Sequence, residues 1–525
     1  MLITATGTAA AVLLAAPLSA LALLRRMHAS VGTAPPTAAM LAEERATDCA
    51  LFRHFPPLRQ KLAWRSLGAI PTAVHRGAVT DPISGRRLSF EVKREDLISS
   101  EYGGNKVRTL QHQLAVCEAK IERASSAAER ARLENLLVIG TGGSNQVVAT
   151  LVHAGRAKLA NVNVAWLQPD QPDLDNSLNM LSTLSLPLGG SRGTWGRPAP
   201  MAAELLRACL GGGVALPLGG NNPSGVLGQA GGALELAEQI ERGEATDPDR
   251  LYLAVSAGRS TLARYYRVAS SRSVRPHPLL PARPGHSPPR HLAQVGSSCT
   301  ISGLVVGVAL SRRLGLAAFR SDSFTIVGVI VHHLFAAAER GVGLHTAPWA
   351  RAVPLTTGHS VRAACAELAA LGGPDVTAEA LEVLARSVTF HHEPQTVGTY
   401  GGHSERSRAA ARAYDATGSL ADARGAPAAP PLWLCGHFVA KAFAAMLEDL
   451  RAAPEGARYL LWQTKSAVQP RGAADEWAAM RAMPAAVRRW ADGGAAESSA
   501  RPGRVDTERG AAEEYRPLMT RLGDD

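Results

Sequence analysis

Lys106 is the residue of this 525-residue chain whose type and neighbours point most directly to covalent chemistry. It follows Gly103, Gly104 and Asn105 in the run 102–108, Tyr-Gly-Gly-Asn-Lys-Val-Arg. Glycines let a backbone approach a ligand closely, and a lysine amine that burial or nearby charge keeps neutral can attack a carbonyl carbon. Taken alone, the motif is equally typical of a surface lysine at the start of a helix.

Three further motifs follow Lys106 in the chain. Residues 140–146 (Gly-Thr-Gly-Gly-Ser-Asn-Gln) close an apolar run, residues 296–303 (Gly-Ser-Ser-Cys-Thr-Ile-Ser-Gly) precede another, and residues 397–401 (Val-Gly-Thr-Tyr-Gly) lead into a helical pattern. A loop between a strand and a helix is a natural phosphate site, because its amides and the helix N-terminus point at the anion. On its own, Ser144-Asn145 would be an ordinary helix N-cap.

Together, these four motifs resemble the 1-aminocyclopropane-1-carboxylate deaminase and D-cysteine desulfhydrase family. That family belongs to the tryptophan synthase β-like, fold type II enzymes, which use pyridoxal 5′-phosphate (PLP). The resemblance covers about Leu51 to Ser466 and includes the run 93–97, Lys-Arg-Glu-Asp-Leu. It implies two parallel-sheet α/β/α domains of three layers each, with the PLP site in the cleft between them. It also implies a homodimer that acts on a small amino acid.

The resemblance gives roles to the residues around the first two motifs. Lys106 would form the Schiff base with the cofactor aldehyde, and Asn105 would hydrogen-bond the phenolic oxygen. The substrate carboxylate would bind Ser144, Asn145 and Gln146 at a helix N-terminus, where an anion is electrostatically favourable. Ser144 would also help to move protons.

The third and fourth motifs complete the implied site. Tyr400 corresponds to an active-site tyrosine near the substrate. The family's phosphate loop usually carries more glycine, so Ser298 and Cys299 are expected to constrain the loop's dihedral angles while they keep its amide donors. The residues implied to hold the phosphate are Gly296, Ser297, Ser298, Cys299, Thr300 and Gly303.

The far end of the implied site departs from the family. Phe438 stands where a tyrosine is expected, so one catalytic hydroxyl is missing. Val439 stands where the deaminases have an acid and the desulfhydrases a threonine. An expected glycine-rich segment is replaced by residues 461–466, Leu-Trp-Gln-Thr-Lys-Ser. Thr464 is the remaining candidate for a neutral hydrogen bond to the pyridine nitrogen.

These features favour a PLP-dependent lyase of the D-cysteine desulfhydrase type, which removes the Cα proton and eliminates sulfide to give pyruvate and ammonia. A 1-aminocyclopropane-1-carboxylate deaminase is the second reading, disfavoured by Phe438 and Val439. A PLP-binding homologue with little catalysis is the third, motivated by the altered phosphate loop. No GxGxxG opens a helix after a strand, which argues against a flavin or nicotinamide enzyme.

Hydrophobic periodicity predicts an α/β fold with parallel sheets. The order strand, glycine turn, helix, strand over residues 135–167 is the βαβ pattern. The folded part of the chain is expected to begin near Leu51. We expect a smaller α/β domain at 110–224, a larger PLP domain made of 51–109 and 225–470, and a polar tail at 471–525. Strands are expected at 88–92, 135–140, 163–167, 251–255 and 323–331, and helices at 147–159, 234–242, 361–371, 378–385, 404–416 and 440–450.

The net charge of +11 does not indicate a nucleic-acid-binding protein. Ser256–Val295 contains seven arginines and no acid, so most of the excess lies in one segment. That segment is rich in Arg, Pro, Ser and His, and a structureless insert of this length is unusual inside a domain. We read it as a basic low-complexity insert, either a surface excursion or retained non-coding sequence. No nucleic-acid-binding motif accompanies it.

The N-terminal segment 2–24 is uncharged and mostly apolar, and two arginines follow it. Its length can span a bilayer, and the arginines favour a cytosolic catalytic domain. A transit peptide is the alternative, because no acid precedes Glu43. The six cysteines are scattered without a CxxC pair, which indicates reduced thiols rather than a zinc site. No metal site is expected at His391-His392-Glu393, because adjacent residues on a strand point to opposite faces, and Lys441 is expected to be solvated.

Overall fold

The computed structural model describes residues 31–470, apart from several gaps. The gaps are residues 48, 142, 160, 168–173, 187–193, 196–207, 209–211, 256–297, 332–351, 399–401, 423, 429–430 and 467. Structural statements below refer to the described residues. The apolar segment 2–24, the insert 256–295 and the tail 471–525 lie outside them. Among the helices that the structure describes, none is long and apolar enough to cross a membrane.

The larger of two sheets has seven strands in the order β10-β1-β2-β11-β7-β8-β9. From β2 to β9 the neighbouring strands are parallel. Strand β1 is antiparallel to both β2 and β10, which differs from the purely parallel sheet that was expected. The strand bounds are β1 Val74–Thr80, β2 Arg87–Lys93, β7 Arg250–Val255, β8 Thr325–Ile330, β9 Val388–His391, β10 Ser419–Ala421 and β11 Tyr459–Trp462.

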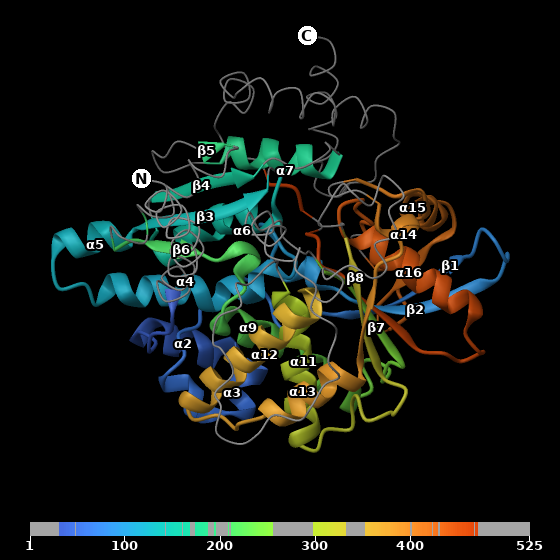
Figure 1. The fold of residues 1–525 in the computed structure, drawn as a ribbon, viewed down its shortest axis with the longest axis horizontal. Coiled ribbons are helices and arrows are strands. Elements are labelled where there is room, and N and C mark those ends of the chain that lie inside the picture. The colour runs from blue at the N-terminus through green and yellow to red at the C-terminus, as the bar shows by residue number, and fades with distance from the viewer. Residues whose placement is uncertain are drawn as a thin grey trace, which may run out of the picture.

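The smaller sheet has four parallel strands in the order β5-β4-β3-β6. Its strands are β3 Asn135–Thr141, β4 Asn161–Leu167, β5 Thr194–Trp195 and β6 Val214–Leu216. In Figure 1 this sheet lies beside the larger one, with α7 (Leu174–Ser185) on one side and α4 (Lys106–Glu122) on the other. The expected α/β class with parallel sheets is confirmed.

Helices cover both faces of the larger sheet, as Figure 1 shows. Helices α14 to α16 lie on one face, and α9, α11, α12 and α13 lie on the other. The alternation of β7 follows this arrangement, because Leu251, Leu253 and Val255 join one hydrophobic cluster while Tyr252 and Ala254 join the second. The bounds are α9 Pro223–Glu241, α11 Cys299–Arg313, α12 Ala352–Ala370, α13 Thr377–Arg386, α14 Pro394–Val397, α15 Glu405–Thr417 and α16 Val439–Ala452.

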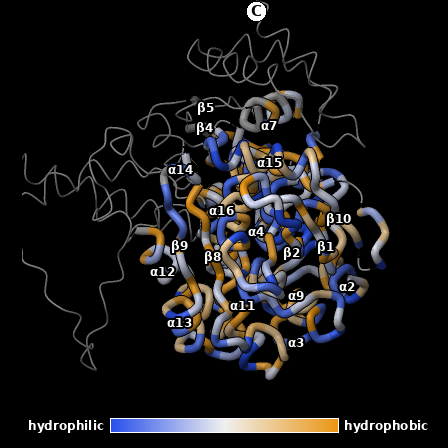
Figure 2. The backbone as a smooth tube through the Cα atoms, turned by 90° about the vertical axis from the view of Figure 1, so that its right-hand side faces the viewer, coloured by the Kyte–Doolittle hydropathy of each residue, from blue (hydrophilic) through white to orange (hydrophobic). Residues whose placement is uncertain are grey.

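Figure 2 shows orange, hydrophobic stretches running through β8 and α11, which matches their burial. Every described strand residue of β8 except Thr325 is buried, and so are the residues of α11 from Cys299 to Ser311. Strands buried on both faces carry continuous apolar runs. This explains why the run at 323–331 predicts a strand.

Two glycines one turn apart let α11 pack tightly against α9. A Cβ added at Gly303 would lie 2.2 Å from Gln229 Cβ and 2.7 Å from Val226 O. A Cβ at Gly307 would lie 2.4 Å from Ala233 Cβ. Gly303 therefore serves helix packing, one turn inside α11, and the expectation that it holds a phosphate is not supported by this position.

Gly303→Ala should accordingly destabilise the protein by about 1–3 kcal/mol, because the added methyl group overpacks the α9–α11 contact. Chemical denaturation of both proteins measures this difference. Gly155→Ala is the matched control, since no heavy atom lies within 4 Å of its added Cβ. Equal stability of Gly303→Ala and the wild type would contradict the packing role.

The N-terminal part of the fold begins earlier than expected. Helices α2 (Ala38–Thr47) and α3 (Ala50–His54) precede the first strand, and Val31 and Met40 belong to the hydrophobic core. The expected start near Leu51 is therefore wrong. Helix α9 begins at Pro223, eleven residues before the predicted helix, because Asn222 caps it and Pro223 suits the first turn.

Candidate active site

Lys106 is the first residue of α4, two residues after Gly104, whose backbone conformation and surroundings leave no room for a side chain without strain. Gly104 has φ +93°, and a Cβ there would lie 2.6 Å from Thr464 O. The amine Nζ of Lys106 donates a hydrogen bond to Gly219 O at 3.1 Å. Desolvation lowers the pKa of Lys106 below its ordinary value, although the Cys299 thiol opposes the shift. The structure thus favours the neutral amine that covalent chemistry needs.

Asn105 connects three segments that are far apart in the sequence. Its Nδ2 donates to Thr300 Oγ1 at 2.8 Å, and its backbone N–H donates to Thr464 O at 3.2 Å. Its carbonyl oxygen accepts from Gln229 Nε2. The start of α4, the start of α11 and the segment after β11 therefore meet at this residue.

The N-terminus of α11 lies beside Asn105 and the loop that contains Gly220. Ser298 Oγ accepts from Asn221 Nδ2 at 3.2 Å, and Cys299 Sγ lies 3.5 Å from Gly220 O. The first amides of a helix have no acceptor within the helix and attract anions. Ser298 has φ −84°, an ordinary value, so the expected strain from the missing glycine is absent at this residue. Gly296 and Ser297 lie outside the described residues.

Several buried polar atoms around these segments have no hydrogen-bond partner among the described residues. Thr464 Oγ1, Asn221 Oδ1 and Gln146 Oε1 are three of them. Buried polar groups are normally satisfied, so unpartnered ones indicate a missing ligand or water. The Thr464 hydroxyl could pair with the ring nitrogen of a flat cofactor, and the first amides of α11 could donate to its phosphate, while the two amide oxygens could accept from a substrate amine or water. The residues present therefore fit PLP.

The helix that begins after β3 carries the expected substrate side of the site. Ser144 occupies the N-cap position of α6 (Asn145–Ala154), but its side chain makes no capping hydrogen bond. The ordinary N-cap reading is thus not what the structure shows. Asn145 Oδ1 accepts from Tyr102 OH at 2.9 Å, and Gln146 Oε1 would lie 3.4 Å from a Cβ at Gly220. Asn145 and Gln146 are therefore adjacent to the lysine motif and to the loop that binds Lys106.

Tyr400 lies outside the described residues, so its expected place near the substrate stays a prediction. Phe438 is half-buried and its ring stacks on His437, with the centroids 3.8 Å apart. Val439 is buried in the hydrophobic core. Neither side chain supplies a hydroxyl or an acid, as the sequence indicates.

The sequence motifs do not include the loop 218–222, which contacts both Lys106 and the N-terminus of α11. Gly219 accepts the hydrogen bond from Lys106, and Gln113 Nε2 donates to Gly220 O at 2.8 Å and to Asn222 Oδ1 at 2.7 Å. The run 219–223, Gly-Gly-Asn-Asn-Pro, is a helix-start signal that could have revealed it.

Lys441 and the His391 cluster lie elsewhere. Lys441 is fully buried and donates to Val331 O at 2.7 Å, so the expectation that it is solvated is wrong. His391 at the end of β9, Glu393 just after it and Glu448 on α16 offer ligand atoms within 4.8 Å of one another. Arg406 forms ion pairs with both carboxylates, so one of their two negative charges is already offset by a side chain.

Comparisons with known proteins give one sequence relative and several similar folds. No family model matches the chain. The chain is 32% identical over 191 residues to nocardicin C-9′ epimerase from Nocardia uniformis subsp. tsuyamanensis, which is 33% of this chain and 52% of that protein. The chain thus spans about half the length of this curated relative.

Similar solved structures have low TM-scores. An ACC deaminase homologue has a TM-score of 0.44 at 16% identity, covering 79% of this chain and 94% of that one. An O-acetylserine dependent cystathionine beta-synthase from Helicobacter pylori has a TM-score of 0.35 at 12% identity, covering 77% and 94%. Threonine deaminase isoform 2 from Solanum lycopersicum has a TM-score of 0.37 at 14% identity, covering 79% and 89%.

Proposed function

We propose that this chain is a PLP-dependent enzyme of the tryptophan synthase β-like kind that acts on a small amino acid. The observation that carries the proposal is the meeting, around Asn105, of the Lys106 amine with the N-terminus of α11 and the unpartnered Thr464 hydroxyl. The Lys106 amine matches the carbonyl of the cofactor, the N-terminus of α11 matches its phosphate, and the Thr464 hydroxyl matches its ring nitrogen. The four sequence motifs support the same conclusion independently.

The residues divide into those that hold the cofactor and those that handle the substrate. Ser298, Cys299 and Thr300 would bind the phosphate, Asn105 would bind the phenolic oxygen and Thr464 would bind the ring nitrogen. When bound, PLP withdraws electrons from the substrate Cα. Lys106 Nζ, once neutral, can accept the Cα proton and later return it. The remaining members, which orient the substrate carboxylate and relay protons, are Ser144, Asn145, Gln146 and Tyr400.

We further propose the D-cysteine desulfhydrase type of reaction, in which cysteine and water give pyruvate, ammonia and sulfide. Thr464 supports it, because a hydroxyl is a neutral partner for the ring nitrogen and not the acid that a stronger electron sink uses. Phe438 and Val439 weigh against a 1-aminocyclopropane-1-carboxylate deaminase. A PLP-binding homologue with little catalysis is the outcome if the cofactor binds without turnover.

An amino-acid epimerase is a second candidate, favoured by the 32% identity to nocardicin C-9′ epimerase. Epimerisation also begins with removal of the Cα proton, but it returns a proton to the opposite face. It requires a second proton carrier, and the Ser144 hydroxyl, which makes no capping hydrogen bond, is the candidate. Both candidates therefore use the same residues up to the first proton transfer.

An absorption spectrum of the protein loaded with PLP tests the proposal. We expect a near-visible band, and borohydride should fix the cofactor onto the peptide that contains Lys106, as mass spectrometry would show. The absence of a band would contradict the central claim. Pyruvate and sulfide release from D-cysteine, L-cysteine or 1-aminocyclopropane-1-carboxylate identifies a lyase, whereas Cα deuterium uptake by a chiral amino acid with loss of optical rotation identifies an epimerase.

Thr464→Val should weaken PLP binding about two- to tenfold and leave the free energy of unfolding of the cofactor-free protein nearly unchanged. Among the described residues the hydroxyl has no hydrogen-bond partner to lose, and a neutral hydrogen bond contributes about 0.5–1.5 kcal/mol. Fluorescence titration with PLP and chemical denaturation measure the two quantities. Thr356→Val, in α12, is the control, and its PLP affinity should equal that of the wild type. Unchanged affinity of Thr464→Val would remove this residue from the site.

A further inference from the structure

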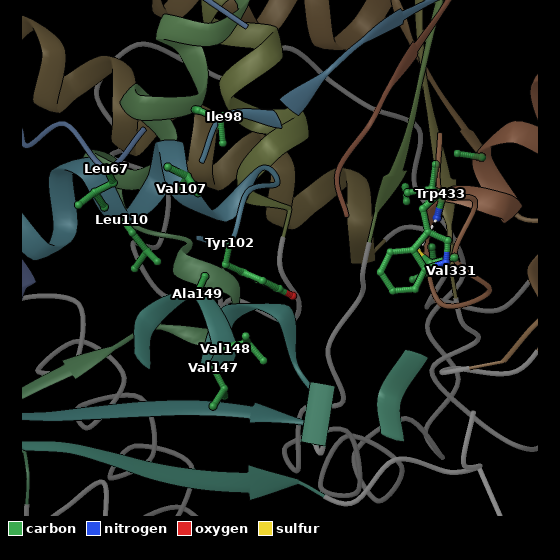
Figure 3. Close-up of a cluster of buried hydrophobic side chains, with 14 of the residues drawn as sticks. Leu67, Ile98, Tyr102, Val107, Leu110, Val147, Val148, Ala149, Val331 and Trp433 are labelled. Atoms are coloured by element: carbon green, nitrogen blue, oxygen red, sulfur yellow. Dashed lines mark hydrogen bonds between the residues drawn. The ribbon is translucent and has the colours of Figure 1, made fainter. Parts of the chain in front are cut away.

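A buried lysine lies directly after Thr464, between two aromatic rings. The side chain of Lys465 is 1% exposed, and its Nζ lies 5.3 Å from the ring centre of Tyr102 and 4.7 Å from that of Trp433. In Figure 3, Tyr102 extends from between α4 and α6 toward the side on which Trp433 lies. Both rings offer their negative faces to the ammonium, which stabilises its charge.

The ammonium of Lys465 also donates to several neutral oxygens. Its Nζ lies 2.8 Å from Asn179 Oδ1, 3.2 Å from Gln469 Oε1 and 3.3 Å from Tyr102 OH. Asn179 and Gln469 are buried, and Gln469 Nε2 donates to the same Asn179 oxygen at 3.0 Å. Tyr102 OH also lies 3.4 Å from this oxygen, so three donors surround the oxygen side of Asn179.

Asn179 connects Lys465 to Asn145 and to the loop before α6, on the proposed substrate side of the site. Its Nδ2 donates to Asn145 Oδ1 at 2.6 Å and to Gly143 O at 2.8 Å. Asn145 Oδ1 also accepts from Tyr102 OH at 2.9 Å. Two donors thus meet the oxygen of the Asn145 amide, and one of them also holds the backbone of the loop that leads into α6.

The orientation of the Asn179 amide is fixed from both ends, by the Lys465 ammonium on its oxygen and by Gly143 O on its nitrogen. An ammonium can only donate, so the Asn179 atom that faces it must be the oxygen. The Asn179 nitrogen must then face Asn145, and the Asn145 atom that it meets must be Oδ1. An asparagine amide can otherwise turn by half a rotation with little change in packing. Lys465, together with Gly143 O, therefore fixes Asn145 with its Nδ2 directed away from the network, as a donor.

We propose that Lys465 is a positioning residue that makes Asn145 a donor for a carboxylate, and so selects substrates that carry an α-carboxylate. The proposal rests on the proposed function for the place of the substrate, at the N-terminus of α6. Lys465 acts through Asn179 and Tyr102 and does not itself touch the substrate. A donor at Asn145 adds to the helix N-terminus, and both favour an anion.

Lys465→Met, which fills the same space without a donor, tests the proposal in the PLP-loaded protein. The probes are racemic alanine and isopropylamine, which has a methyl group in place of the carboxylate, with binding measured by calorimetry. We expect alanine to bind about tenfold or more weakly to Lys465→Met, the scale of one lost charge-assisted hydrogen bond. Isopropylamine should change less than twofold, and the near-visible band should keep its intensity.

Two further variants separate positioning from folding. Lys465→Arg keeps the donors and should restore most of the alanine affinity. Asn179→Asp keeps an acceptor for Lys465 but cannot donate to Asn145, so it should reproduce the loss. If Lys465→Met binds both alanine and isopropylamine equally more weakly, or binds neither more weakly, while the near-visible band is present, the inference is overturned. A wild-type protein without the band contradicts the proposed function, and the inference falls with it.

Discussion

Lys106→Ala is expected to abolish the near-visible absorption of the PLP-loaded protein and to lower turnover about a thousandfold or more. The variant loses both the amine that attaches the cofactor and the group that accepts the Cα proton, and a general base alone contributes about 10²–10⁴-fold. Spectra before and after borohydride, together with pyruvate release, measure the two losses. A variant that keeps either the band or the turnover would show that another lysine holds the cofactor.

The matched control is a lysine on the surface of the protein. Lys158 has a side chain that is 61% exposed and pairs with Glu122 at 2.9 Å. Lys158→Ala should leave the spectrum and the turnover at wild-type values. A loss of the band in this variant too would indicate that general destabilisation, and not the loss of the amine, explains the result for Lys106.

The lowered pKa of Lys106 makes a separate prediction for stability without the cofactor. Its pKa lies below the ordinary value in the folded protein, so the charged amine disfavours folding. That penalty is full at pH values below the lowered pKa and vanishes above 10.5, the ordinary value. Near pH 7, cofactor-free Lys106→Met should therefore be as stable as the wild type or more stable, as a residue retained for function would require.

The sequence predicts the lysine end of the site because its signals are local. The glycine turn before Lys106 and the strand–loop–helix order at Ser144 are set by neighbours within a few residues. The structure brings Asn105, Thr300 and Thr464 together, as the resemblance implied. The core strands could also be predicted, because strands buried on both faces carry uninterrupted apolar runs.

The parts that the sequence does not predict depend on contacts between distant segments. Asn179 and Lys465 are 286 positions apart, and nothing near either residue indicates that they meet. The burial of Lys441 is of the same kind, because its acceptor, Val331 O, is 110 positions away. A helical lysine is normally solvated, and only the tertiary fold supplies the acceptor that overrides this expectation.

A buried ion network includes Arg108, two residues after Lys106, and its disruption is expected to lower stability strongly. Glu235, on α9, accepts hydrogen bonds from Lys93 Nζ at 2.6 Å, Arg108 Nη2 at 2.8 Å and the backbone N–H of Thr72 at 2.7 Å. Arg108 also pairs with Glu95, and these four charged side chains are almost fully buried. The network therefore joins α4, α9 and β2.

Glu235→Gln should destabilise the protein by about 3–5 kcal/mol at pH 7, because it removes the anion shared by two buried cations. Chemical denaturation measures the change. Glu241→Gln is the control on the same helix, since Glu241 is exposed and its substitution should cost less than about 0.5 kcal/mol. A similar small cost for Glu235→Gln would mean that Glu95 alone balances the charge of Arg108.

The pH dependence of this difference identifies its cause. Burial alone would raise the pKa of Glu235, but Arg108 and Lys93 hold it at about 2, below the ordinary 4.5. A carboxyl with a lowered pKa stabilises the folded state fully above 4.5, and this stabilisation is lost as the pH falls toward 2. The gap between the wild type and Glu235→Gln should therefore be constant from pH 7 to about pH 5 and shrink below that. A gap that stays constant down to pH 2 would attribute the destabilisation to packing and not to charge.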